Sequence, residues 1–227
     1  MENDKPLYEI IDEDELPYAY GQDDPDRPAD PDVDGGEKEK SRPSRMNLLW
    51  RVMLGPATGW KDLKRASLKL KKESVASVYF YPLCVAAALS QFVDLIYEAN
   101  QSVLKLIVSA LVIFVSYIFS YIVLPILGRP FLCAEANRTL ETNFGRNALM
   151  VLFSTLALFK VAYNAIPFME PVLVFLPLWT IYLIHRLVPV MRVPKEKWGT
   201  TTVILSVLTV GLPSFWQWLF AVLLPGV

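Results

Sequence analysis

The sequence predicts an all-α integral membrane protein, with five transmembrane helices, interfacial amphipathic helices on the cytoplasmic side and a disordered acidic N-terminal tail. Hydrophobic residues make up 53% of the 227 residues, and the mean hydropathy of +0.34 exceeds that of most soluble domains. Charge is divided along the chain. Residues 1–41 carry 15 acidic and 4 basic side chains, whereas residues 42–227 carry 8 acidic and 18 basic ones. This division favours an acidic solvated tail joined to a basic membrane domain.

Residues 1–45 are expected to form the cytoplasmic tail. Repeated prolines and like charges between residues 23 and 36 leave little apolar surface to bury, so this part should be disordered. Between residues 7 and 18, apolar side chains mix with acidic ones. This pattern fits a short motif that folds on a partner, and it also fits a solubilising tail with incidental hydrophobic residues. The candidate partner-binding residues are Tyr8, Ile10, Ile11, Leu16 and Tyr18.

Residues 46–72 are expected to form two interfacial helices. Apolar residues from Met46 to Leu54 recur at i, i+3, i+4, i+7 and i+8, which indicates one face of a helix. A Gly-Pro pair then interrupts the helix, and the next apolar face is surrounded by lysines and arginines. Such helices suit the plane of a lipid interface, although packing against the bundle is the alternative. The candidate interfacial residues are Trp50, Gly55, Pro56 and Trp60.

Five apolar segments follow, each of about 20 residues, which is enough to cross a hydrocarbon core about 30 Å thick. The predicted spans are approximately residues 76–97, 103–127, 147–167, 171–191 and 201–224.

The loops between these spans predict the topology. Nine lysines and arginines lie in residues 42–72, three in the loop after the second span, and three in the loop after the fourth. The loops after the first and third spans and the segment after the fifth contain none. Because cytoplasmic loops carry the excess of Lys and Arg, the N-terminus is predicted to be cytoplasmic and the C-terminus extracytoplasmic.

Three ionisable residues in or beside the spans are candidate functional groups, namely Asp94, Lys105 and Lys160. The helical rise places Asp94 and Lys105 near the outer interface and Lys160 somewhat deeper. Asp94 and Lys160 could neutralise each other as a pair. The alternative is that each side chain extends to the outer surface.

The sequence gives no sign of an enzyme. His185 is the only histidine, and Cys84 and Cys133 are the only cysteines, so no metal-site spacing is present. Phosphate-binding glycine loops, nucleophile elbows and paired catalytic carboxylates are also missing. We expect no catalytic residue, no cofactor and no metal.

Several features together resemble the Yip family of five-span membrane proteins, whose eukaryotic members interact with Ypt/Rab GTPases. The features that resemble this family are a Leu-Leu-x(5)-Gly-Pro-x(3)-Trp stretch at 48–60, a basic loop after the second span, the sequence Leu-Trp-Thr-Ile-Tyr-Leu-Ile from residue 178, and a basic loop at 193–199. The resemblance covers residues 46–227, the predicted Yip-like membrane domain. It implies a non-enzymatic protein that acts through partners. The acidic motif at residues 8–16 is only faintly similar and the family's Gly/Tyr-rich motif is missing, so a bacterial-type member in the cytoplasmic membrane is expected.

The predicted function is therefore that of a scaffold, assembly factor or membrane-organisation and trafficking factor whose tail binds a partner. The expected partners are the lipid bilayer and a cytoplasmic or membrane protein. Self-association stays open, and nothing indicates nucleic-acid binding. The alternative function is a small transporter or channel component that uses Asp94, Lys105 and Lys160.

Overall fold

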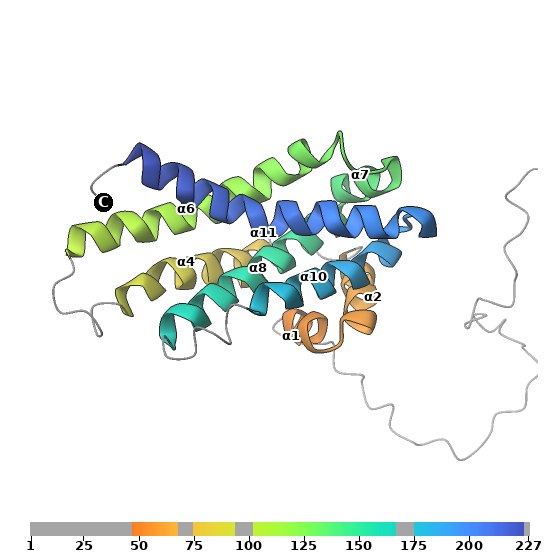
Figure 1. Cartoon of the computed structure of the whole chain (residues 1–227). Coiled ribbons are helices and arrows are strands. Elements are labelled where there is room, and N and C mark those ends of the chain that lie inside the picture. The colour runs from red at the N-terminus through yellow and green to blue at the C-terminus, as the bar shows by residue number, and fades with distance from the viewer. Residues whose placement is uncertain (1–46, 68–74, 94–101, 167–174, 225–227) are drawn as a thin grey trace, which may run out of the picture. The chain divides into compact units, whose positions relative to one another are not determined.

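The computed structural model describes residues 47–67, 75–93, 102–166 and 175–224, all within the compact unit formed by residues 42–227. Every regular element in these ranges is helical, and no strand occurs among them (Figure 1). The all-α prediction is therefore confirmed for the part of the chain that the structure describes.

Among the described residues, four helical segments are long and apolar enough to cross a membrane. The first consists of the π-helix η2 (Ala76–Phe80), α4 (Tyr81–Leu89) and the 3-10 turn η3 (Ser90–Val93). The others are α6 (Val103–Gly128), α8 (Asn143–Ala165) and α11 (Trp198–Leu223), the last preceded by the short turn η6 (Lys195–Lys197). These segments agree with the predicted spans to within a few residues, and they indicate a membrane protein.

Only part of the predicted span at 171–191 lies within the described residues. Its described part is α10 (Leu176–Leu187) followed by the 3-10 turn η5 (Val188–Met191), and residues 167–174 lie outside the described ranges. Sixteen residues reach only about 24 Å at the α-helical rise, less than a full hydrocarbon core. Pro189 lies at the start of η5, where its missing N–H favours the change from α-helix to 3-10 turn. The count of five spans is not confirmed and stays a prediction.

The distribution of side chains on α6 and α11 suits a lipid environment. The buried stripe of α6 contains small or weakly polar residues such as Ala110, Ser116 and Ser120, whereas Leu104 and Ile122 point outward. Helix α11 buries four hydroxyl residues and exposes apolar ones such as Val207 and Trp218. Small and hydroxyl residues at helix contacts, with large apolar residues outside, are typical of membrane helices. The buried hydroxyl residues of α11 are Thr201, Thr202, Ser206 and Thr209.

Helix α8 is the centre of the bundle. It contacts α4, α6, α10 and α11 as well as the shorter helices α2 (Pro56–Ser67) and α7 (Ala134–Glu141). Every residue from Asn147 to Ala157 is buried, so no face of this segment is left for lipid. The Thr142 side chain caps the helix by accepting a hydrogen bond from the Gly145 N–H at 3.2 Å, which explains why α8 begins four residues before the predicted span.

The short helices lie together at one end of the bundle. Helix α1 (Asn47–Leu54) and α2 form a hairpin there, and α7 and the start of α11 lie at the same end (Figure 1). The basic residues of the connecting segments therefore gather at this end, which agrees with the alternation found in the sequence. They include Lys61, Lys64, Arg65, Arg129, Arg138, Arg146, Arg192, Lys195 and Lys197.

Candidate functional site

The hairpin of α1 and α2 turns at Gly55, as the sequence suggests. Pro56 is the first residue of α2, where its missing N–H costs no hydrogen bond and its fixed φ suits a helix. The Gly55 carbonyl accepts hydrogen bonds from the Gly59 N–H at 2.8 Å and the Thr58 N–H at 3.2 Å. Thr58 lies within the first turn of α2, and its hydroxyl also donates to the Gly55 carbonyl at 3.2 Å.

A second glycine, Gly59, sets how closely the two helices of the hairpin approach. A Cβ atom at this position would lie 2.6 Å from the Arg51 carbonyl oxygen and 2.6 Å from the Val52 Cα. Both are backbone atoms, so no side-chain rotation could make room. The sequence pattern pointed to Gly55 and missed Gly59, because the need for a missing Cβ arises only when the helices cross.

Trp60 joins the hairpin to the bundle. Its side chain is fully buried, and its indole N–H donates a hydrogen bond of 3.0 Å to the Leu183 carbonyl of α10. Leu63 is buried beside it, whereas Trp50 is 50% exposed and Leu54 is 79% exposed. The sequence left two interpretations open. Packing against the bundle holds for Trp60, whereas the exposed Trp50 and Leu54 are compatible with an interfacial position. Trp60 does not face lipid, because both its ring and its N–H are used by the bundle.

Two further polar contacts hold α2 in place. The Lys64 ammonium donates to the Val190 carbonyl at 2.8 Å and lies 5.7 Å from the centre of the Phe144 ring. At the end of α2, the buried Asn147 amide donates to the Ser67 hydroxyl at 3.1 Å. Burial lowers the pKa of Lys64 from its usual value, and the positive charge of Arg192 lowers this pKa further.

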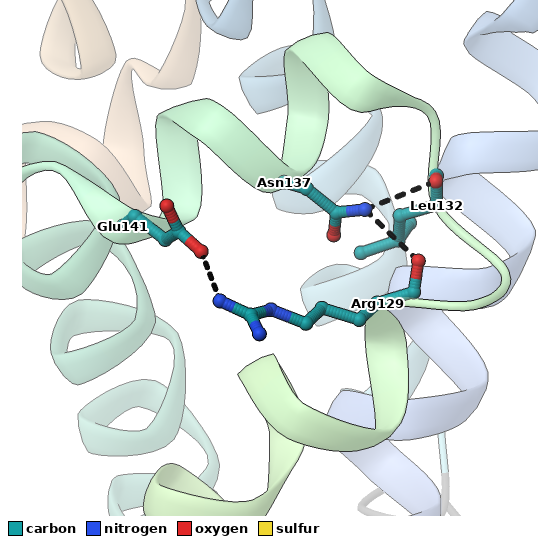
Figure 2. Close-up of polar contacts among 4 residues, drawn as sticks. All are labelled: Arg129, Leu132, Asn137 and Glu141. Atoms are coloured by element: carbon teal, nitrogen blue, oxygen red, sulfur yellow. Dashed lines mark hydrogen bonds and ion pairs between the residues drawn. The ribbon is translucent and has the colours of Figure 1, made fainter.

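The corner between α6 and α7 is closed by Asn137, whose amide N–H groups donate to the Arg129 carbonyl at 2.9 Å and to the Leu132 carbonyl at 3.1 Å (Figure 2). The first bond satisfies the carbonyl of Arg129, which caps the end of α6, and the second fixes the turn that leads into α7. Figure 2 also shows the exposed ion pair between Arg129 and Glu141, which adds little stability in water. The Thr139 hydroxyl, in turn, donates to the Met191 carbonyl at 3.0 Å and ties α7 to η5.

At the opposite end of the bundle, two of the predicted intramembrane residues line one cavity. Lys105 of α6 and Lys160 of α8 border a space of about 180 Å³, together with Gln91, Ser109 and Gln217. The Ser109 hydroxyl donates to the Gln91 side-chain oxygen at 3.2 Å. Lys160 is half-buried, whereas Lys105 is exposed. The sequence placed Lys160 somewhat deeper than Lys105, and the cavity shows that both side chains border the same space.

Lys160 and Gln217 also line a second cavity of about 340 Å³, which reaches Tyr117, Tyr163 and Ser214. The Lys160 ammonium lies 5.2 Å from the centre of the Tyr163 ring. Asp94 falls outside the described residues, so the predicted pair of Asp94 and Lys160 stays a prediction. Gln217 was missed from the sequence, because one amide within an apolar run gives no periodic signal.

The remaining candidate residues do not form a reaction centre among the described residues. His185 is exposed, Cys84 is buried and Cys133 is half-buried, with its sulfur 3.8 Å from the Thr201 hydroxyl. Within residues 47–67, 75–93, 102–166 and 175–224, no three His, Cys, Asp or Glu side chains gather in a metal-binding group. The candidate partner-binding residues of the tail, Tyr8, Ile10, Ile11, Leu16 and Tyr18, lie outside the described residues.

Comparison with known proteins adds no assignment. No family model, no curated protein and no solved structure matches the chain. The resemblance to the Yip family thus rests on the sequence features alone and stays a prediction.

Proposed function

We propose that this protein is a non-enzymatic multi-pass membrane protein of the Yip type that acts as a scaffold, assembly factor or membrane-organisation and trafficking factor. One observation carries the proposal, namely that the α1–α2 hairpin is joined to the bundle through buried groups. The fully buried Trp60 and the contact between Ser67 and Asn147 link the segment that follows the tail directly to α10 and α8. A partner that binds the tail would therefore be coupled to the membrane domain.

The proposed setting is the bacterial cytoplasmic membrane, with five spans, the N-terminus in the cytoplasm and the C-terminus outside it. The gathering of basic residues at one end of the bundle supports this orientation, because Lys and Arg are retained on the cytoplasmic side. A reporter fused after Val227 should read as extracytoplasmic. A cytoplasmic reading would contradict the count of five spans.

The tail's role is tested by crosslinking the protein in its own membrane, with and without residues 1–41. Loss of particular crosslinked partners on deletion supports the proposal. The matched control is the full-length chain in which Tyr8, Ile10, Ile11, Leu16 and Tyr18 are replaced by serine, which keeps the tail's charge. An unchanged set of partners in both variants would remove the tail from the proposal.

A second candidate function, that of a small transporter or channel component, is favoured by the neighbouring cavities that share Lys160 and Gln217. Reconstituted protein would then conduct an ion or small polar solute, and Lys160→Met or Lys105→Met would reduce the flux. Lys195→Met is the control, because Lys195 lies at the other end of the bundle. Absence of flux for ions and small polar solutes would leave the scaffold as the only candidate.

A further inference from the structure

Four basic residues converge on a pocket at the hairpin end of the bundle. Helix α2 contributes Lys61, Lys64 and Arg65, which are spaced i, i+3 and i+4 and so lie on one side of the helix. The turn that follows α10 contributes Arg192. Pro189 and Val190 complete a pocket of about 340 Å³, a size within the range of small-ligand sites.

The backbone of Arg192 is held in an unusual conformation. Its φ of 60° is the only positive value for a non-glycine residue among those the structure describes, and its N–H donates to the Pro189 carbonyl at 3.1 Å. A left-handed conformation is costly for a residue with a Cβ atom, and such residues occur often at binding sites. Here it ends η5 and brings the Arg192 side chain to the pocket that α2 lines.

Among the described residues, no carboxylate balances the positive charge of this pocket. None lines the pocket there, and none of these four cations forms an ion pair with another described residue. The neighbouring carboxylate of Asp62 is instead bonded to Arg51 at 3.2 Å. Burial and the positive charge of Arg192 both lower the pKa of Lys64, so two like charges lie near each other at the pocket. An anion between them would relieve this repulsion.

We propose that this basic pocket binds a phosphate group, either that of an anionic phospholipid headgroup or inorganic phosphate. Several cations around one small space match the spread charge of a phosphate, and arginine in particular binds its oxygens through two N–H groups. Basic pockets beside membrane helices on the cytoplasmic side are suited to lipid headgroups. The apolar Pro189 and Val190 on the pocket wall would lie next to the glycerol backbone of such a lipid.

Native mass spectrometry of the full-length protein in detergent can test the proposal, with dioctanoyl phosphatidylglycerol and dioctanoyl phosphatidylcholine as probes. The wild type should bind the anionic lipid more tightly. Each neutralised cation should weaken binding about fivefold, so Lys61→Gln/Arg65→Gln should weaken it roughly 25-fold. Both side chains are exposed, so the fold should survive, which an unchanged far-UV circular dichroism spectrum would confirm.

The matched control is Lys195→Gln/Lys197→Gln, which removes the same charge at the same end of the bundle but outside the pocket. The proposal would be overturned if the wild type bound phosphatidylglycerol and phosphatidylcholine equally and bound no inorganic phosphate. It would also be overturned if the two double variants weakened the binding of the anionic lipid equally. Adding inorganic phosphate distinguishes the two sources of the phosphate group. If inorganic phosphate at an equal concentration displaces the lipid, the pocket is a site for free phosphate. If the lipid stays bound, the pocket is a site for a lipid headgroup. If lipid preference emerges only after deletion of residues 1–41, the acidic tail is the occupant and the proposal fails.

Discussion

Replacing Gly59 by alanine is expected to open the hairpin of α1 and α2. The new Cβ would lie 2.6 Å from the Arg51 carbonyl oxygen and from the Val52 Cα, so the two helices must move apart. Overpacking of this kind costs about 1–3 kcal/mol. The higher helix propensity of alanine offsets up to about 1 kcal/mol of that cost. Because both clashing atoms belong to the backbone, the upper part of this range applies, and the net loss in the stability of the hairpin should be about 1–2 kcal/mol.

Hydrogen exchange followed by mass spectrometry can measure this loss, because local opening sets the exchange rate of the α1 and α2 amides. A loss of 1–2 kcal/mol corresponds to exchange roughly 5–30 times faster in these helices, with α8 unchanged. Gly55→Ala is the matched control, since a Cβ there would have its nearest neighbours at 3.5 Å. Wild-type exchange in Gly59→Ala, or equally fast exchange in Gly55→Ala, would refute the close-contact argument.

Three other predictions follow from single contacts. Trp60→Phe removes the hydrogen bond to α10 and should lower the free energy of unfolding by about 1 kcal/mol in detergent titrations, whereas Trp50→Phe at a half-exposed site should change it little. Asn137→Ala removes two hydrogen bonds and should cost about 1–3 kcal/mol, seen as a lower unfolding midpoint; an unchanged midpoint would contradict their role. The pKa of Lys64 is lower in the folded state than in the unfolded state. At pH values between these two pKa values, the unfolded state therefore binds more protons than the folded state. Stability should therefore rise with pH across this alkaline window, and Lys64→Gln should flatten the rise in unfolding midpoint.

The positions of most helices could be predicted from the sequence, because long apolar runs in a membrane protein have few alternatives to a helix. The predicted span at 103–127 matches α6 almost residue for residue. The predicted span at 171–191 ends with η5 at Met191, although its apolar composition does not show that the α-helix changes to a 3-10 turn near Pro189.

The sequence could not predict which side of each helix faces the bundle. Hydrophobic periodicity shows which face of a helix is turned toward water. It does not distinguish a face that contacts lipid from a face that packs in the protein interior, because both surroundings are apolar. Trp60 and Trp50 therefore look alike in sequence, although one is fully buried and the other is half-exposed. Likewise, the helical rise placed Lys160 somewhat deeper than Lys105, but it could not show that the two lysines border one cavity or that Gln217 from a distant helix completes it.

The contacts of α2 also impose an order on biosynthesis. Its partners Asn147, Leu183 and Val190 follow it in the chain by 80, 123 and 126 residues. At about 5–20 residues per second, Val190 is made roughly 6–25 s after Lys64. The hairpin, which precedes all the long apolar helices in the chain, is consequently among the last parts to complete its contacts. Until α10 has been made, Trp60 lacks the carbonyl to which its indole N–H donates in the folded protein.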